Sequence, residues 1–315
     1  MADVVAIGEL LIDFTCVGKD EDGYPTMAAH PGGAPANFLA ALAKFGTSTA
    51  LIGKVGNDAF GKLLVGTLES AGIETGGIIV DDSVFTTLAF VTLDEYGDRD
   101  FSFARKPGAD TCINDDEINL QMIDEAKVFH FGTLSLTDDP ARSATYKAVS
   151  YAKEKGKMIT FDPNLRKPLW KDLETAKKQI LWGLKQADVV KISDEEVEFL
   201  FGCKPEQGAE YILREFGVKL VFVTCGANGC YFKNENASGW VPALQAIHVI
   251  DTTGAGDIFG GSAVWKILQI GQRPEDLSTE QLCAIVKFAC TSAGLSTTKS
   301  GGISSVPTLQ TIINR

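Results

Sequence analysis

Short, β-branched apolar runs alternate with helical patterns along nearly the whole chain, and this alternation constrains the fold more than any other feature. The strand-like runs include VVAIGEL, TALIGKVG, VFHFG, KMITFDPN, VVKIS and LVFVT. They are continuously apolar, as expected of strands that are buried on both faces. Segments such as PANFLAALAKFG and LETAKKQILWGLKQA lie between them and have helical spacing, and several end on a glycine suited to a C-terminal cap. The pattern predicts a mostly parallel sheet with helices on both faces.

One region departs from this alternation. Residues 86–104 hold two β-rich runs joined by D-E-Y-G-D without a helix, which indicates a hairpin, and GYPTMAAHPGG favours further short strands. We expect a small antiparallel sheet that projects from the main body, formed by insertions near 14–31 and 84–110. Because no repeat or linker divides the sequence, residues 1–315 are predicted to form a single domain.

Charge and cysteine usage exclude several classes of protein. The formal net charge of −12 argues against a nucleic-acid partner. The seven cysteines include no C-x-x-C pair, so a structural zinc site is not expected, and a reduced, cytoplasmic compartment fits best. The N-terminus lacks a basic region before its apolar residues, and no run of about 18 apolar residues occurs. The sequence therefore predicts neither a signal peptide nor a membrane span.

The segment DTTGAGD (251–257) leads directly into an apolar helical stretch. Glycines that open a helix are typical of a loop whose N–H groups bind an anion. Phe259 stands where a dinucleotide-binding loop has its third glycine, and Asp257 stands where a Walker A loop has its lysine. Two interpretations remain open. The segment is either a tight turn with Asp257 at the helix dipole, or a loop that stabilises a transferring phosphoryl group while Asp257 accepts a proton from the acceptor hydroxyl. The N–H groups in question belong to Gly254, Ala255, Gly256 and Asp257.

Motifs near both ends of the chain resemble the ribokinase-like (PfkB-type) carbohydrate kinases. DTTGAGDIFGG resembles the C-terminal signature of that family, and PGGAPAN (31–37) with IGKVGNDAFG (52–61) resembles the N-terminal one. FSFARKPGAD (101–110) and FDPNLRKPLW (161–170) resemble its fructokinase branch. The resemblance covers essentially the entire chain. It implies a ribokinase-like α/β fold with a β-sheet lid, ATP as phosphoryl donor, and a possible homodimer through the lid.

The resemblance also assigns residues to the sugar. It implies that the sugar is held by Asp13, Gly32, Gly33 and Asn37. A carboxylate accepts hydrogen bonds from neighbouring hydroxyls, and glycines permit close approach of the backbone. Without the family, an exposed loop acid and a local helix cap are the simpler interpretations of Asp13 and Asn37.

The two fructokinase-like stretches supply the remaining candidates at the sugar and phosphoryl sites. Phe103 is expected to cover an apolar face of the sugar, and Arg105 to reach a sugar oxygen or the nascent phosphate. Asp162 is assigned to the substrate site, where with Asn164 it shapes the loop after a strand. Arg166 is expected to neutralise the transferring phosphoryl group. For Arg105 a solvated surface position remains an equal alternative.

Nucleotide and metal candidates come from three further stretches. Ser193 and Glu196 form an S-x-x-E pattern that is sufficient as a helix capping box; in the family, the glutamate position holds Mg²⁺ through water. The threonine and glycines of VTCGANGCYF also fit a simple hairpin turn, and Asp251 also fits a brace for its own turn. The resemblance assigns the nucleotide to Lys191, Ser193, Thr224, Gly226 and Gly229, and a possible monovalent cation, K⁺, to Asp251 and Thr253.

The resulting expectation is an ATP-dependent kinase that phosphorylates D-fructose to fructose 6-phosphate. A 2-keto-3-deoxygluconate kinase is the nearest alternative, because Arg105 and Lys106 offer positive charge to a carboxylate-bearing substrate. A catalytically silent sugar sensor on the same scaffold ranks lower, because the glycine loop and Asp257 are both intact. Residue types alone do not decide between these sugars.

Overall fold

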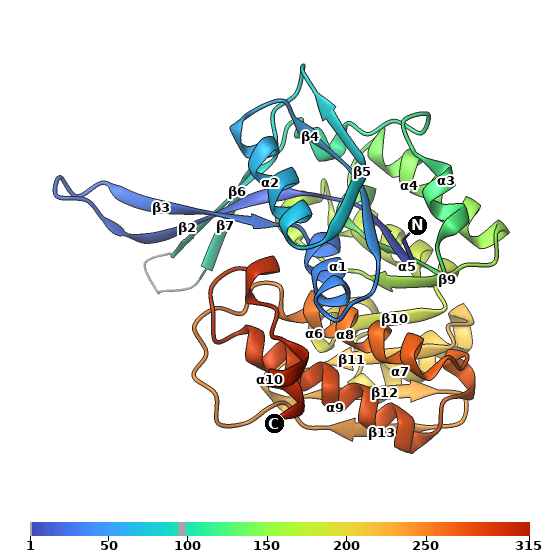
Figure 1. The fold of residues 1–315 in the computed structure, drawn as a ribbon. Coiled ribbons are helices and arrows are strands. Elements are labelled where there is room, and N and C mark those ends of the chain that lie inside the picture. The colour runs from blue at the N-terminus through green and yellow to red at the C-terminus, as the bar shows by residue number, and fades with distance from the viewer. Residues whose placement is uncertain (1, 94–98) are drawn as a thin grey trace.

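The computed structural model describes residues 2–93 and 99–315, and its main body is a nine-stranded sheet (Figure 1). The strands lie in the order β13 (Ser238–Val241), β12 (Cys230–Asn234), β11 (Leu220–Thr224), β10 (Val189–Ser193), β9 (Met158–Asp162), β8 (Val128–Gly132), β1 (Val4–Ile7), β4 (Thr49–Gly56) and β5 (Ile73–Asp81). All pairings from β11 to β5 are parallel, and only those of β12 are antiparallel. The predicted mostly parallel sheet is confirmed.

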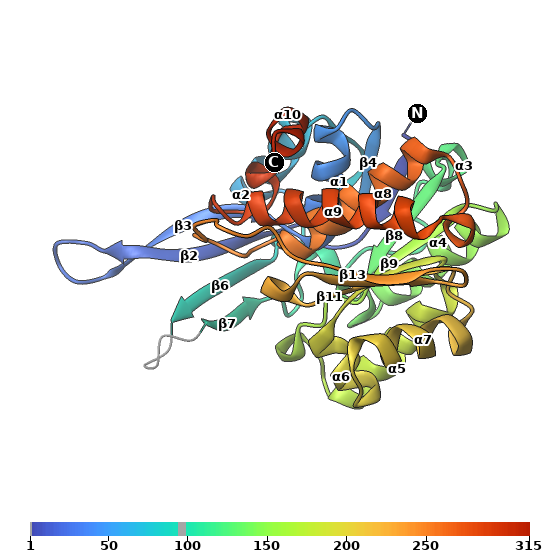
Figure 2. The ribbon, with the colours of Figure 1, turned by 90° about the horizontal axis from the view of Figure 1, so that it is seen from below.

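Helices cover both faces of this sheet, as Figure 2 shows. Alternate residues of a strand point to opposite faces. In β1, Val5 and Ile7 therefore join one apolar core, whereas Val4 and Ala6 join another. The first core is covered by α3 (Leu120–Glu125), α4 (Ala141–Glu154), α5 (Leu173–Gln186), α6 (Asp194–Phe201) and α7 (Pro205–Phe216). The second face carries α1 (Ala34–Lys44), α2 (Ala59–Ser70), α8 (Ala255–Ile270), α9 (Thr279–Ser296) and α10 (Leu309–Ile313).

A second, four-stranded sheet projects from the body and forms the lid (Figures 1 and 2). Its order is β3 (Pro25–Gly32), β2 (Leu11–Lys19), β6 (Leu88–Leu93) and β7 (Arg99–Ala104). The predicted small sheet is confirmed, with β2–β3 and β6–β7 antiparallel and β2–β6 parallel. The parallel pair arises because the chain passes through the main body between these two strands. The D-E-Y-G-D turn predicted at 94–98 lies outside the described residues.

The candidate site lies where strands of the main sheet end and helices begin. The strand predicted from VVAIGEL ends at Ile7, and the chain then turns into β2 of the lid. Pro35 lies in the first turn of α1, and Ser193 with Glu196 forms the predicted capping box of α6. Short 3₁₀ helices occupy Ala109–Thr111, Leu134–Leu136, Lys167–Leu169, Gly226–Asn228, Pro274–Asp276 and Ile303–Ser305. Across the described ranges, no helix has the length and apolarity required to cross a membrane.

Candidate active site

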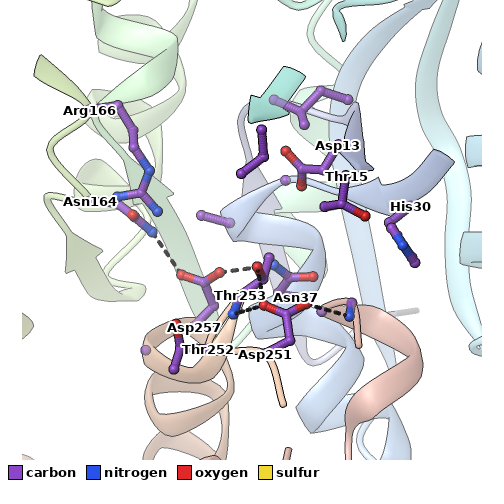
Figure 3. A pocket seen from close by; sticks show the side chains of 18 of the residues that line it. Asp13, Thr15, His30, Asn37, Asn164, Arg166, Asp251, Thr252, Thr253 and Asp257 are labelled. Carbon is purple, nitrogen blue, oxygen red and sulfur yellow. Dashed lines mark hydrogen bonds between the residues drawn. The ribbon is translucent and has the colours of Figure 1, made fainter. Parts of the chain in front are cut away.

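A cavity of about 920 Å³ lies between the lid and the carboxyl ends of the parallel strands. This is where ligands bind in open α/β sheets. The residues singled out from sequence that line it are Asp13, Gly33, Asn37, Phe103, Arg166, Lys191, Ser193, Glu196, Thr224, Gly226, Asp251, Thr253, Gly254, Gly256 and Asp257. Five others do not line it: Gly32, Arg105, Asp162, Gly229 and Ala255. Figure 3 shows part of the cavity, with Asp13 and Asp257 entering it from opposite sides.

Asp257 lies in the first turn of α8 and is 7% exposed. The Nδ2 group of Asn37 donates to its Oδ2 at 2.9 Å, and the Nδ2 group of Asn164 donates to its Oδ1 at 2.7 Å (Figure 3). Burial raises the pKa of Asp257, whereas nearby Lys191 and the amide of Asn37 act in the opposite direction. The carboxyl group is thus largely buried at the cavity wall, with one donor fixed on each oxygen.

The glycine loop opens α8 without a side-chain cap. Gly254 precedes the helix at φ 74°, a left-handed conformation that favours glycine, and within the described chain no side chain caps this N-terminus. A Cβ at Gly254 would lie 3.0 Å from Asn37 Nδ2, and one at Gly256 would lie 2.8 Å from Lys191 Nζ. The first N–H groups of a helix have no partner within the helix, so this N-terminus is able to bind an anion.

Lys191 and Asp162 form a buried ion pair beside this loop. Lys191 Nζ is 3.0 Å from Asp162 Oδ2. Burial raises the pKa of Asp162 to about 7. Burial alone would lower the pKa of Lys191, but Asp162, Glu196 and Asp257 outweigh that effect and raise it. Lys191 therefore remains cationic at the base of the loop, and Asp162, proposed from sequence for the substrate, instead contacts this lysine.

On the lid side, Asp13 lies in β2, and its pKa is raised to about 6 by burial, although Arg166 opposes that shift. A Cβ at Gly32 would lie 2.3 Å from Asp13 Oδ2, so only glycine leaves room for this carboxylate. Gly33 has φ 123°, and a Cβ there would lie 2.4 Å from the carbonyl oxygen of Glu9. These contacts explain why two glycines occur in succession at this point.

Arg105 is buried outside the cavity. Its Nε donates to Asp110 Oδ2 at 2.8 Å, its Nη1 to Thr137 Oγ1 at 2.9 Å, and its Nη2 to the carbonyl of Leu134 at 2.8 Å. All three nitrogens of the guanidinium group are thus used inside the protein. Arg105 therefore holds the segment after β7 against the loop after β8, and this structural role fits its contacts better than binding of a sugar does.

One side of the cavity, which the sequence assigned to the nucleotide, is formed by the ends of β10 and β11. Ser193, Glu196, Thr224 and Gly226 line it. Glu196 Oε2 accepts from the N–H of Ser193 at 2.9 Å, and Oε1 accepts from the N–H of Leu165 at 2.7 Å. Each carboxylate oxygen retains a further lone pair for a water or a metal ion. Gly229 lies away from the cavity with φ 97°, and a Cβ there would clash with the strand backbone at Val241.

Asp251 braces the turn ahead of the glycine loop. Its Oδ1 accepts from Thr253 N at 2.9 Å and from Thr253 Oγ1 at 2.7 Å, and its Oδ2 accepts from Gly301 N at 3.0 Å (Figure 3). The turn is thereby fixed to the segment after α9. In the described parts of the chain, no group of three or more His, Cys, Asp or Glu side chains is arranged to hold a metal ion.

Sequence reasoning gave no ligand-contacting role to several polar residues that line the cavity, among them Glu9, Thr15, His30 and Asn164. Burial raises the pKa of Glu9 to about 7, and its Oε1 accepts from the N–H of Ala34 at 2.7 Å. Thr15 follows Asp13 at the two-residue spacing of one strand face, which is a usable signal. His30 is paired with Asp13 across β2 and β3, a register that the sequence does not specify.

Comparison with known proteins gives consistent results over the whole chain. The model of the pfkB family carbohydrate kinases matches residues 1–309. Fructokinase-1 of Zea mays is 41% identical over 309 residues, covering 97% of this chain and 94% of the relative. The fructokinase of Xylella fastidiosa with bound ATP has a TM-score of 0.91 at 29% identity, covering 100% and 98% of the two chains. A double mutant of the fructokinase of Vibrio cholerae O395, bound to fructose, ADP and potassium ion, has a TM-score of 0.88 at 31% identity and the same coverage.

Proposed function

Because the chain belongs to the pfkB family and is an ATP-dependent carbohydrate kinase, we propose that its substrate is D-fructose, phosphorylated at the terminal hydroxyl to give fructose 6-phosphate. The observation that carries the proposal is the position of Asp257. It lies at an uncapped helix N-terminus, buried, on the opposite side of the cavity from Asp13 (Figure 3). Such an arrangement suits a hydroxyl held between a base and a phosphoryl group. The fructokinase relatives support fructose as that alcohol.

The sugar is held at the lid end of the cavity. Asp13 accepts hydrogen bonds from two sugar hydroxyls, with Gly32 and Gly33 leaving room for its carboxylate and for the ligand. Phe103 covers an apolar face of the ring. Asn37, which already donates to Asp257, contacts the hydroxyl nearest the reacting oxygen. With the lid over the site, water is excluded and ATP hydrolysis is limited.

Phosphoryl transfer takes place at the start of α8. Asp257 removes the proton of the terminal hydroxyl, the oxygen bonds to the γ-phosphorus, and the bond to the bridging oxygen breaks to release ADP. The N–H groups of Gly254, Ala255, Gly256 and Asp257 stabilise the charge on the phosphoryl oxygens. Arg166, on the cavity wall, and Lys191, beside Gly256, add positive charge.

The nucleotide and its ions occupy the other end of the cavity. Thr224, Gly226 and Ser193 lie beside the ATP phosphates. Glu196, whose oxygens retain lone pairs in the cavity, would hold hydrated Mg²⁺, which neutralises phosphate charge when bound. Asp251 and Thr253 would fix the turn that carries a K⁺ site, in keeping with the potassium named in the Vibrio cholerae structure.

Three features bear on the assembly, the location and the competing substrate. The outer strand β3 of the lid has an open edge, and Val17 and Tyr24 on β2 and the following turn are exposed, which supports pairing of two lids in a homodimer. The seven free cysteines support a cytoplasmic location.

Because the Arg105 guanidinium is committed to Asp110, it offers no charge to the carboxylate of 2-keto-3-deoxygluconate, and this favours a neutral sugar.

The substrate assignment is tested by an ADP-release assay with ATP and Mg²⁺ across fructose, ribose, tagatose, 2-keto-3-deoxygluconate and nucleosides. We expect the highest kcat/KM with fructose. Activity confined to 2-keto-3-deoxygluconate would replace fructose with that acid. No turnover of any of these substrates by the folded protein would favour a sugar-binding protein that does not catalyse.

A further inference from the structure

Asn164 contacts the reacting carboxylate but has no part in the reaction outlined above. Its Nδ2 group lies 2.7 Å from Asp257 Oδ1, on the side opposite the Asn37 contact. We propose that Asn164 is a positioning residue that fixes the orientation of the Asp257 carboxylate and keeps it ionised for proton transfer. The inference rests on the proposed role of Asp257 as general base.

The position of Asn164 is fixed from both sides along the chain. The hydroxyl of Thr133 donates to the carbonyl of Pro163, and the N–H of Leu165 donates to Glu196 Oε1 at 2.7 Å. Asn164 itself is 7% exposed and has φ 49°, a left-handed conformation that asparagine adopts more readily than most residues. The loop after β9 therefore presents the amide in one orientation before any substrate binds.

Two amides leave the carboxylate with a defined set of free lone pairs. Each carboxylate oxygen of Asp257 has two lone-pair sites, and each accepts one amide N–H. The remaining lone pairs are directed to the cavity, since Asn37 and Asn164 come from opposite walls (Figure 3). Without Asn164, the carboxylate would be able to rotate about its Cβ–Cγ bond. Its alignment with the acceptor hydroxyl would then be lost in part of the molecules.

The amide also favours the charged form of Asp257. Burial raises the pKa of this carboxyl group, and among the groups that lower it is the hydrogen bond from Asn164. The charged groups that face Asp257 from the surrounding elements are Lys191 on β10, Arg166 after β9, Asp162 on β9 and Asp13 on β2. Lys191 is the strongest of the groups that lower this pKa, and the amides of Asn37 and Asn164 act in the same direction. Removal of the Asn164 amide is therefore expected to move the pKa of Asp257 upward.

The direct test is Asn164→Gly, because glycine tolerates the left-handed backbone and removes the side chain together with its amide. We expect the acidic limb of the kcat/KM profile for fructose to move up by about one to two pH units, the size expected for loss of a hydrogen bond to a charged group. At pH 7 we expect kcat to fall at least about tenfold, with the KM for ATP unchanged. An acidic limb at the wild-type pH would overturn the proposal, whatever the loss of kcat.

Asn234→Ala is the matched control. Asn234 is also a buried asparagine, and its Nδ2 donates to the carbonyls of Pro274 and Leu277 in the connection between α8 and α9. Its loss is expected to lower Tm but to leave the acidic limb unchanged, since these hydrogen-bond partners do not line the cavity. If this variant moved the limb as far as Asn164→Gly does, the shift would report general destabilisation and would count against Asn164.

Two further variants complete the test. If Asn164→Gly does not fold, Asn164→Asp takes its place. Aspartate keeps the size and the backbone preference of asparagine but puts a second carboxyl group beside Asp257. We expect a strong loss of kcat above pH 7, and a wild-type kcat above pH 7 would refute the proposal. Asp257→Asn separates the two levels of the argument. An inactive Asp257→Asn together with an unshifted Asn164→Gly removes only the role of Asn164. An active Asp257→Asn removes the base assignment and this inference with it.

Discussion

Replacement of Gly32 by alanine is expected to weaken sugar binding while leaving the fold intact. A Cβ at this position would lie 2.3 Å from Asp13 Oδ2, 3.3 Å from Asp13 Cγ and 3.7 Å from Leu11 Cδ1. Gly32 is paired with Leu11 in the β2–β3 ladder and has no left-handed φ, so its backbone conformation suits alanine. Because the clash involves the end of a rotatable side chain, Asp13 swings away and the strand remains in place.

The size of the effect follows from what Asp13 then loses. A hydrogen bond to a charged group contributes about 1.5–3 kcal/mol, and about 1.4 kcal/mol corresponds to a factor of ten. If rotation removes one such bond to the sugar, kcat/KM for fructose falls about 10- to 150-fold. The change falls mainly on the KM for fructose, because Asp13 holds the ground state and the transition state alike. The KM for ATP is expected to stay at the wild-type value.

The assay is steady-state ADP release, with fructose varied at saturating ATP and then ATP varied at saturating fructose. Asp13→Ala serves as a reference for the loss of the carboxylate. Gly76→Ala is a matched control, because Gly76 is an exposed strand glycine in β5 whose Cβ would meet only Glu74 Oε1 at 3.6 Å. A Gly32→Ala protein with wild-type Tm and a fructose kcat/KM within twofold of wild type would refute the reasoning about Asp13.

Two other predictions concern the charged groups around the loop. Lys191→Met is expected to cost about 3–5 kcal/mol of stability at pH 8 and less at pH 5. Burial raises the pKa of Asp162 to about 7, so the folded protein binds a proton there more readily than the unfolded chain does, and stability is lost as pH rises from about 4 to 7. Without Lys191 this loss of stability with rising pH becomes larger. Urea unfolding of the wild type and of Lys191→Met at pH 5 and pH 8 measures the free energy of unfolding. An equal cost of the substitution at both pH values would contradict the prediction. Asp251→Ala is expected to weaken activation by K⁺ several-fold, because Asp251 fixes the turn through Thr253 and Gly301. The measurement is kcat as a function of KCl concentration at constant ionic strength. An unchanged K⁺ dependence would exclude this role of Asp251.

Hydrophobic periodicity was sufficient to predict the main sheet and its helices. Strands such as β8 and β11 are buried on both faces, so their apolar runs are continuous and easily recognised. The end of β1 at Ile7, inside VVAIGEL, was not predictable, because Leu10 and even Glu9 beyond it are as buried as the strand itself. The parallel β2–β6 pair depends on how the chain crosses the main body, which local sequence does not encode.

The composition of the site was easier to predict than its contacts. Motifs placed Asp257 at the start of a helix after a glycine loop, and the structure has it there. They did not indicate that Asn164, 93 residues away in sequence, donates to it. The pairing of Lys191 with Asp162 is likewise tertiary, since it joins the end of β9 to the middle of the neighbouring strand β10. Charged residues read singly were therefore assigned to ligands, whereas the fold pairs several of them with one another.

The measurement that tests the account most directly is the turnover of Asp257→Asn with fructose and ATP. Asparagine has nearly the same shape but cannot accept the hydroxyl proton at neutral pH. We expect fructose binding, measured by calorimetry, to stay close to wild type, while kcat falls by roughly two orders of magnitude or more. Turnover at the wild-type rate would contradict the central claim that this carboxylate is the base in phosphoryl transfer.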